Sequence, residues 1–382
     1  MAIGRAGRRT PRWAVLCAVF GALLMLVSGG ALVATELALS RVGGAIREGD
    51  LFGQPDDDPD YGEDIDGPLN LLLAGLDTRP SRPDETPRAD AIMIVHINQT
   101  LDRGYMISLP RDALVDIPPQ LESGYLGGRD RLNAAMFHGA DPAPGEDGPD
   151  VERGFALLAS TISQLTGIER FDAGVVLRFE GFRDIVDAMG GITVDLQERI
   201  ISEHRTPDGT HREVGCGSYC GPQMVYEPGS PPCEEAAQAD GPFRCELNGW
   251  QALDVVRQRK SLEEGDYGRQ ENQQRVLEAI MDGAVSRDMV TNPVALDRLL
   301  QAVGDAMIFD GRGNEVIDFA FALRDLRPGR LVSFGVTGDS VGVGSDYQGE
   351  ELHPEVFDLF EALNQGQLDQ FILEHPDLIA DR

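Results

Sequence analysis

The apolar run Leu69-Asn-Leu-Leu-Leu-Ala74, followed at once by Gly75-Leu-Asp-Thr-Arg79, decides the fold class of this 382-residue chain. A short apolar run that ends in a polar turn is typical of a strand buried within a sheet. Two similar runs follow at residues 91–97 and 104–109, separated by a polar turn at 98–103. These three runs predict a sheet whose strand ends carry aspartate and arginine.

Helices are predicted after these strands. Apolar residues recur on one helix face at 151–165, and Gly167 supplies a C-terminal stop. A strand at 174–179, a helix stripe at 182–189 and a strand at 192–196 follow. Strands that alternate with helices predict an α/β domain in which helices cover a sheet. Later helices are predicted at 247–260, 267–286 and 293–307, with a closing strand at 331–336.

Residues 202–246 interrupt this pattern with glycine, proline, cysteine and charge. A structureless segment of this length is unusual inside a compact domain, so we expect an insertion held by cross-links. The cysteines in it are Cys216, Cys220, Cys233 and Cys245. They predict two disulfides with three possible pairings. Zinc binding together with His204 and His211 is the alternative.

The amino-terminal segment predicts the compartment. Arginines at 5, 8, 9 and 12 precede an uncharged apolar run at 13–34, which is long enough to cross a bilayer as a helix. Basic residues before a span predict a cytoplasmic amino terminus and an extracytoplasmic main domain, anchored in the cell membrane. A cleaved signal peptide is the alternative, although the apolar run is longer than such peptides usually carry.

Composition limits the partners. With 33 basic and 64 acidic side chains the formal net charge is −31, which argues against a nucleic-acid partner unless arginines are concentrated at one place. The predicted organisation is a cytoplasmic basic segment at 1–12, a transmembrane anchor at 13–36, an acidic linker at 37–67, a main domain at 68–340 and a C-terminal extension of it at 341–382.

Aspartate and arginine lie where the predicted strands end. Asp77 follows the first strand, Asp90 precedes the second and Arg111 follows the third. If these strands are neighbours, the three side chains converge on one rim. Two carboxylates that would repel each other can share a magnesium ion, which commonly bridges carboxylates to phosphate. Turn formation and capping are the alternative role of such residues.

A second polar cluster lies between two predicted helices. It comprises Arg257, Arg259 and Lys260 at the end of one helix, and Asp266, Arg269 and Gln273 at the start of the next. Arg257 and Arg259 cannot share one stripe of a regular helix, so their spacing predicts an end that unwinds toward a ligand. Arginine binds phosphate oxygens two at a time, although cations here also complement the helix dipole.

Six stretches in the same order resemble the LytR–CpsA–Psr proteins of bacterial envelopes, over roughly residues 67–338. They are 70–79, Arg88-Ala-Asp90, Ser108-Leu-Pro-Arg-Asp112, Arg131-Leu-Asn133, 182–194 and 247–274. The resemblance implies an α/β/α sandwich with a central mixed sheet, preceded by one transmembrane helix, and a deep apolar groove for a polyprenyl chain. It also implies transfer of a glycan phosphate from a polyprenyl-pyrophosphate carrier to a wall acceptor such as peptidoglycan, which releases polyprenyl phosphate.

The resemblance further implies a role for each matching residue. Asp77 and Asp90 resemble a pair that binds Mg²⁺ or Mn²⁺. The implied catalytic residues are Arg111, Arg257, Arg269 and Asp266, the last as an orienting residue or as a base. The implied substrate-binding residues are Arg79, Arg88, Arg131, Arg259 and Gln273. Asn272 departs from the family pattern, which often has arginine there. Hydrolysis with water as acceptor, and a non-catalytic adaptor that binds the lipid-linked precursor, are the alternative functions.

Overall fold

A seven-stranded mixed sheet forms the centre of the computed structural model, which describes residues 46–53, 62, 64–78, 84–204, 224–238, 241–284, 292–323, 326 and 331–379. The strand order is β1-β12-β7-β2-β3-β4-β13. Strands β2, β3 and β4 pair antiparallel, whereas β7 runs parallel to β2 and β13 parallel to β4. In this order the bounds are β1 (Arg47–Glu48), β12 (Met307–Asp310), β7 (Ala173–Arg178), β2 (Leu69–Leu76), β3 (Ala89–Ile97), β4 (Gly104–Ser108) and β13 (Leu331–Gly335).

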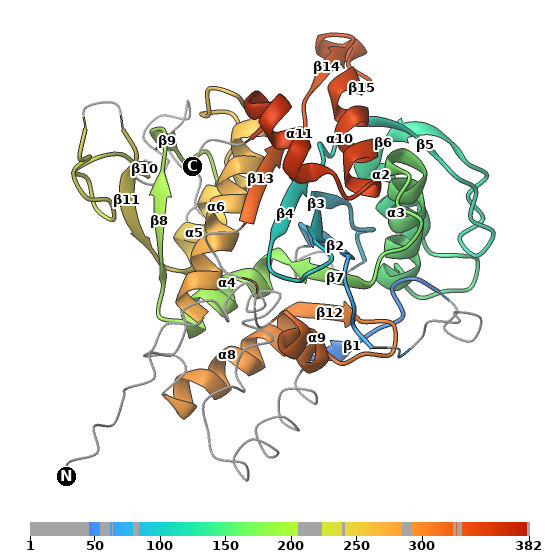
Figure 1. Ribbon diagram of the computed structural model, residues 1–382, viewed down its shortest axis with the longest axis horizontal. Coiled ribbons are helices and arrows are strands. Elements are labelled where there is room, and N and C mark those ends of the chain that lie inside the picture. The colour runs from blue at the N-terminus through green and yellow to red at the C-terminus, as the bar shows by residue number, and fades with distance from the viewer. Residues whose placement is uncertain are drawn as a thin grey trace.

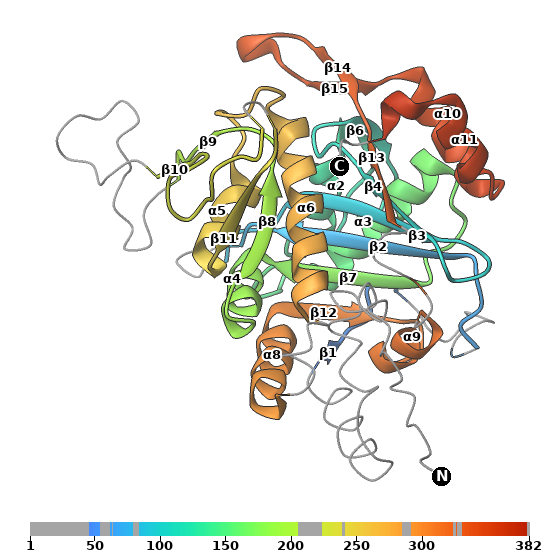
Figure 2. The same ribbon diagram turned by 60° about the vertical axis from the view of Figure 1, so that its left-hand side comes forward.

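Helices cover both faces of this sheet (Figure 1). On one side lie α4 (Phe179–Ala188), α5 (Gly249–Arg257), α6 (Asp266–Ala284), α8 (Pro293–Ala306) and α9 (Val316–Ala322). On the other side lie α2 (Leu132–Ala140), α3 (Val151–Thr166), α10 (Pro354–Asn364) and α11 (Leu368–Glu374). Figure 2 shows α6 crossing in front of the strands. The predicted α/β/α sandwich with a mixed central sheet is therefore confirmed.

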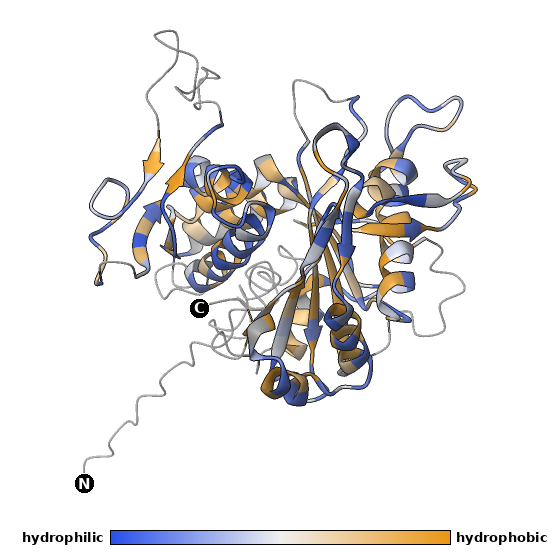
Figure 3. Ribbon diagram, turned by 90° about the horizontal axis from the view of Figure 1, so that it is seen from above, coloured by the Kyte–Doolittle hydropathy of each residue, from blue (hydrophilic) through white to orange (hydrophobic). Residues whose placement is uncertain are grey.

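The apolar run that begins β2 is continuous because both faces of this strand are buried. Side chains alternate between the faces of a strand, so Leu71 packs into the core under α4 to α6 and Leu72 into the core under α2 and α3. Each is at most 2% exposed. The strands accordingly take the hydrophobic colour along much of their length in Figure 3, whereas the helices show both colours.

The ends of two helices follow from local chemistry. Asp150 caps α3 by accepting a hydrogen bond from the backbone N–H of Arg153, and Gly167 ends the helix at a φ of 75°, a conformation that glycine adopts without steric cost. Asn248 and Gln251 form a capping box at the start of α5. That helix ends at Arg257, and Gln258 is already extended. The unwound end predicted from the spacing of the arginines is confirmed.

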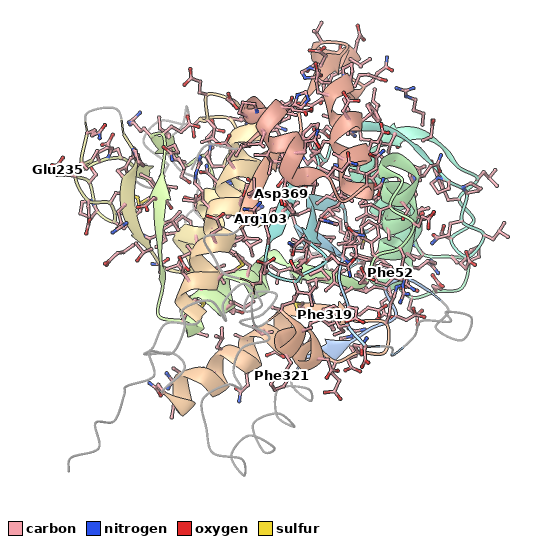
Figure 4. The ribbon with its side chains drawn as sticks, viewed as in Figure 1. Phe52, Arg103, Glu235, Phe319, Phe321 and Asp369 are labelled. Carbon is pink, nitrogen blue, oxygen red and sulfur yellow. A yellow bond between two sulfur atoms is a disulfide. The ribbon has the colours of Figure 1, made fainter. Side chains whose placement is uncertain are left out.

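The described residues of the insertion at 202–246 include two strands, which the sequence pattern does not predict. Strand β11 (Phe243–Leu247) pairs antiparallel with β8 (Ile192–Leu196), and β10 (Val225–Tyr226) with β9 (Ile200–Ile201). Alternate residues of β11 are buried, a two-residue period that the surrounding glycines and prolines conceal in the sequence. A disulfide joins Cys233 to Cys245. Glu235 marks this outlying part of the molecule in Figure 4.

The other two cysteines of the insertion, Cys216 and Cys220, lie outside the described residues, as does His211. Across the described ranges no group of three or more His, Cys, Asp or Glu is arranged to hold a metal ion. The second predicted disulfide and the zinc alternative therefore both stay predictions.

The domain includes residues that precede its predicted start at residue 68. Residues 46–53 fall within the expected acidic linker, yet β1 pairs with β12 at the edge of the sheet and Leu51 is fully buried. Phe52 stacks on Phe171. Three apolar residues in eight are too few to predict a strand, so this contact depends on the tertiary structure rather than on a local pattern. The segment 46–53 is a part of the domain and not of a linker.

The C-terminal segment also packs onto the domain. Leu359, Leu363 and Phe371 of α10 and α11 are buried in the core under α2 and α3. Arg103 and Asp369 form an ion pair and lie side by side in Figure 4. Two further ribbons are β5 (Leu114–Ile117) with β6 (Gly128–Arg131), and β14 (Gly338–Val341) with β15 (Gly349–Leu352), and single 3₁₀ turns span Gly344–Asp346 and Pro376–Leu378.

The predicted transmembrane anchor at 13–36 lies outside the described residues. None of the helices described here is both long and apolar enough to cross a membrane.

Candidate active site

The antiparallel order of β2, β3 and β4 brings three predicted site residues to one edge of the sheet. Asp77 follows the end of β2, Asp90 lies at the start of β3, and Arg111 follows the end of β4. These three points share an edge because neighbouring antiparallel strands run in opposite directions. All three residues line one pocket of about 260 Å³. The convergence predicted from the sequence is confirmed.

Residues at the unwound end of α5 also line this pocket. The full lining is Asp77, Asp90, Arg111, Phe179, Glu203, His204, Val256, Arg257, Gln258, Arg259, Lys260, Arg269 and Gln273. Five cationic side chains therefore face three carboxylates, in a chain whose overall charge is strongly negative. A pocket with an excess of positive charge favours an anion with more than one negative charge.

Two arginines of the pocket are held by the two predicted metal ligands. Arg257 donates a hydrogen bond from Nη2 to Asp77 Oδ2 at 2.7 Å, and Arg111 donates from Nη1 to Asp90 Oδ1 at 2.5 Å. These four side chains are 20–27% exposed. The first pair joins the end of β2 to the end of α5, and the second joins the neighbouring ends of β3 and β4. The two ion pairs therefore fix the rim of the pocket.

Asp266 lies among three arginines. Its Oδ2 accepts a hydrogen bond from Arg269 Nη2 at 2.9 Å. Its Oδ1 is 3.7 Å from Arg111 Nε and 3.8 Å from Arg259 Nη1. The carboxylate is 13% exposed and is absent from the pocket lining. Of the two roles expected for Asp266, this position favours the orientation of the arginines.

Burial and charge act differently on two of these guanidinium groups. Burial lowers the pKa of Arg269, and the positive charge of Arg111 lowers it further, against the opposing effect of Asp266. For Arg111 burial also acts to lower the pKa, but Asp90, Asp266 and Asp112 outweigh it and the pKa is raised. Arginine stays protonated in proteins, so the pocket keeps its positive charge.

Three predicted site residues lie elsewhere or are not described. The guanidinium of Arg88 lies over the ring of Phe137, 4.4 Å from its centre, which is a cation–π contact. Arg131 pairs with Asp112 at 3.4 Å, next to the pocket rather than in its lining. Arg79 lies outside the described residues.

Gln273 lines the pocket, but the asparagine before it does not. Gln273 Nε2 donates to the carbonyl of Val256 at 3.1 Å and so ties α6 to the last turn of α5. Asn272 is 2% exposed, and its Nδ2 is buried without a hydrogen-bond partner. An asparagine at this position therefore changes the interior of the domain rather than the lining of the pocket.

The pocket lining also includes residues for which the sequence indicates no role in phosphate binding, namely Phe179, Glu203, His204 and Gln258. Glu203 and His204 come from the start of the insertion, which was expected as a separate feature. The Nε2 atom of His204 is buried without a hydrogen-bond partner. Only the proximity of His204 to four cysteines drew attention to it, and that signal suggested zinc.

The fold and the pocket together define an α/β/α domain with a cluster of arginine side chains in a pocket at one edge of its sheet. A family model described as the LytR_cpsA_psr family matches residues 52–364. The chain belongs to the LytR–CpsA–Psr family, as the resemblance indicated.

Two curated relatives carry the same name, polyisoprenyl-teichoic acid–peptidoglycan teichoic acid transferase TagU. That of Oceanobacillus iheyensis is 28% identical over 293 residues, which cover 74% of this chain and 72% of that protein. That of Enterococcus faecalis is 27% identical over 278 residues, which cover 72% of this chain and 73% of that protein.

Solved structures share the fold. The protein gbs0355 from Streptococcus agalactiae superimposes with a TM-score of 0.57 at 23% identity, covering 79% of this chain and 88% of that one. TagT bound to LI-WTA gives a TM-score of 0.53 at 21% identity, with 84% and 98% covered. At these identities the likeness supports the architecture alone.

Proposed function

We propose that this protein transfers a glycan phosphate from a polyprenyl-pyrophosphate carrier to a hydroxyl of a cell-wall acceptor such as peptidoglycan, releasing polyprenyl phosphate. The observation that carries the proposal is the pocket in which Arg111, Arg257, Arg259 and Arg269 meet at the sheet edge. A pyrophosphate that links two groups has two negative charges, which this excess of cations can neutralise. The names of the TagU relatives describe a transfer of the same kind.

The arrangement of the pocket arginines suits a transfer reaction in which the enzyme holds the pyrophosphate in place and stabilises its negative charge. During cleavage of a pyrophosphate, negative charge develops on the leaving phosphate oxygens, so fixed cations lower the barrier without a covalent enzyme intermediate. Asp266 holds the buried Arg269 in place at 2.9 Å. A guanidinium fixed before the substrate arrives loses little entropy when it binds phosphate.

Asp77 and Asp90 are suited to hold the expected Mg²⁺ or Mn²⁺. Each uses one carboxylate oxygen to accept a hydrogen bond from an arginine, and a carboxylate has a second oxygen with which to bind a cation. Magnesium is commonly held by one or two carboxylates together with phosphate oxygens and water, so a third protein ligand is not required. When bound, the ion would supply further positive charge to the phosphates.

The polyprenyl chain is proposed to lie between the sheet and the helices α4 to α6. Phe179 and Val256 contribute apolar side chains to the pocket. They lie at the start of α4 and near the end of α5, on the side of the sheet that these helices cover. The donor lipid is a membrane component, and the apolar run at 13–34 is proposed to anchor the domain on the outer side of the cell membrane.

Turnover of a lipid-linked glycan by the full-length protein in detergent tests this proposal. The assay contains the polyprenyl-pyrophosphate glycan, Mg²⁺ and a peptidoglycan acceptor, and it measures polyprenyl phosphate and the glycan–acceptor product. Release of polyprenyl phosphate only when the acceptor is present supports transfer. Release without acceptor would indicate hydrolysis, and lipid binding without turnover would indicate an adaptor. Either result contradicts the proposal.

Replacement of one pocket arginine tests the binding of phosphate. Arg259→Ala is the sharpest variant, because Arg259 is 42% exposed and its contact with Asp266 is long, at 3.8 Å. We expect the rate to fall about 100-fold with little change in thermal stability. The matched control is Arg244→Ala, an exposed arginine on β11 that pairs with Asp195. A variant Arg259→Ala with wild-type turnover would contradict the assignment.

Replacement of Asp90 tests whether this residue binds the metal ion. In Asp90→Asn the Mg²⁺ concentration for half-maximal turnover should rise at least about tenfold, because one charged ligand is lost. Titration of Mg²⁺ against initial rate measures this change. An unchanged Mg²⁺ response would show that Asp90 serves only to hold Arg111.

A further inference from the structure

The C-terminal ribbon of β14 and β15 reaches the arginine cluster through one residue of β15. The backbone N–H of Glu350 donates a hydrogen bond to the carbonyl of Asp112 at 2.8 Å, and Glu350 pairs with Ala113 in a parallel bridge. Asp112 and Ala113 directly follow Arg111 in the chain. The ribbon is therefore attached to the segment that carries Arg111 into the pocket.

The side chain of the same glutamate reaches the start of α6. Glu350 Oε2 accepts a hydrogen bond from Tyr267 Oη at 2.7 Å. The Tyr267 hydroxyl oxygen in turn accepts a hydrogen bond from the backbone N–H of Gly338 in β14, at 2.8 Å. Tyr267 directly follows Asp266 and lies two residues before Arg269. Both strands of the ribbon are therefore attached to the first turn of α6.

These contacts join two parts of the arginine cluster that make no hydrogen bond with each other. Arg111 Nε lies 3.7 Å from Asp266 Oδ1, which is too far for a hydrogen bond, and both atoms are buried without a hydrogen-bond partner. Asp266 holds Arg269 at 2.9 Å. The distance from Arg111 to this pair therefore depends on the two backbone segments that carry them. Glu350 connects these two segments.

We propose that Glu350 and Tyr267 are positioning residues for the transfer reaction, an inference that rests on the proposed function. Neither residue lines the pocket, so both act through the arginines. Their hydrogen bond keeps the segment of Arg111 and the first turn of α6, with Arg269, at the separation at which both cations meet the donor pyrophosphate. Cations that are already in place stabilise the charge developing on the leaving phosphate without a cost of rearrangement.

The next residue of β15 provides a matched control. Successive side chains of a strand point to opposite faces, and Glu351 pairs with Arg129 at the surface, where the two side chains are 60% and 53% exposed. The two glutamates are neighbours in one strand, so replacement of either changes the same ribbon. Only the loss of Glu350 removes the connection to Tyr267.

Variants of the full-length protein in detergent test the proposal. Glu350→Ala removes the acceptor of the Tyr267 hydroxyl, and Tyr267→Phe removes the hydroxyl and keeps the ring. In both we expect kcat for transfer to fall by at least about tenfold, while KM for the lipid-linked donor changes less than about threefold because all the cations remain. Glu350→Gln keeps an acceptor oxygen and should retain at least about half of the wild-type rate. Glu351→Ala should transfer at the wild-type rate, and all rates are compared below the temperature at which any variant begins to unfold.

Hydrogen–deuterium exchange tests the connection without turnover. In Glu350→Ala the peptides that contain residues 111–113 and 266–270 lose an attachment, so their backbone amides should exchange faster than in the wild type. The same peptides should be unchanged in Glu351→Ala. Faster exchange confined to the ribbon itself would show that Glu350 does not connect the two segments.

The rates separate positioning from a general structural role. If Glu350→Ala and Tyr267→Phe transfer at the wild-type rate, or if Glu351→Ala is as slow as Glu350→Ala, the hydrogen bond does not position the arginines. The same conclusion follows if Glu350→Gln is as slow as Glu350→Ala, or if the loss lies in KM alone. If the wild-type protein does not transfer, the proposed function is refuted, and the exchange result still decides whether Glu350 connects the two segments.

Discussion

The carboxylate of Asp266 is predicted to be the structural centre of the arginine cluster, and Asp266→Asn tests this. The substitution keeps the size of the side chain and removes its charge. Arg269 then loses its partner at 2.9 Å, with side chains only 6% and 13% exposed. Arg111 and Arg259 lose a neutralising charge 3.7 and 3.8 Å away.

The size of the effect follows from this burial. Removal of one partner from a buried ion pair costs about 3–5 kcal/mol. The asparagine oxygen can still accept one hydrogen bond, so we expect about 2–3 kcal/mol, since a neutral acceptor recovers part of the interaction. For a domain of this size the melting temperature should fall by about 3–4 °C. Differential scanning fluorimetry of the full-length protein in detergent measures this fall.

Inorganic pyrophosphate should reverse much of the loss. The anion supplies negative charge to arginines that the variant leaves unneutralised, so it should raise the melting temperature of the variant more than that of the wild type. Asp195→Asn is the control, because Asp195 pairs with Arg244 at an exposed site and its loss should have no measurable effect. If Asp266→Asn has the melting temperature of the wild type and pyrophosphate stabilises both proteins equally, Asp266 is not the structural centre of the arginine cluster.

Two further predictions concern buried polar groups away from the pocket. Tyr226→Phe removes one hydrogen-bond donor from the Asp254 carboxylate and should lower the free energy of unfolding by about 1–3 kcal/mol. Urea unfolding measures this change, and an unchanged midpoint would show that the hydrogen bond contributes little. Burial lowers the pKa of His96 to about 4, against about 6.5 in an unfolded chain. Between these values the unfolded chain binds the extra proton, so stability falls as pH falls from about 6.5 toward 4. Between pH 7 and pH 5 the free energy of unfolding should fall by about 2 kcal/mol more in the wild type than in His96→Gln. If urea unfolding shows the same fall in both proteins, the lowered pKa of His96 is not the cause.

The sequence predicts the buried strands well because their signal is local. The apolar run in β2 is continuous since both faces of that strand are covered, and β8 has the predicted bounds, Ile192–Leu196. Its buried residues alternate with exposed ones. Strand β12, by contrast, has four residues and follows α8 without a turn between them. It is a strand because β7 and β1 lie beside it, and no local pattern contains that information.

The residues of the site likewise include some whose positions the sequence predicts and some whose positions it does not. Residue types and spacing predict that Asp77, Asp90 and Arg111 meet, because the argument needs only three neighbouring strands. Arg88 belongs to the same short motif as Asp90, yet its side chain stacks on Phe137 of α2, a helix that no pattern in the sequence predicts. The position of His204 depends on hydrogen bonds that join the insertion to α5. The positions of Arg88 and His204 therefore both depend on partners that are distant in sequence.

The pairing of arginines with aspartates also bears on how the proposed substrate binds. In the absence of substrate, Asp77 neutralises Arg257 and Asp90 neutralises Arg111, so the pocket is stable without a ligand. A donor that arrives with a divalent cation offers each group a new partner: phosphate oxygens for the arginines, and the metal for the aspartates. Such an exchange keeps every charge neutralised and avoids the cost of burying an unpaired one. It follows that pyrophosphate and Mg²⁺ should bind each more tightly in the presence of the other. Pyrophosphate alone would draw the arginines away and leave the two aspartates without a partner, whereas a metal ion on the second carboxylate oxygens would supply one.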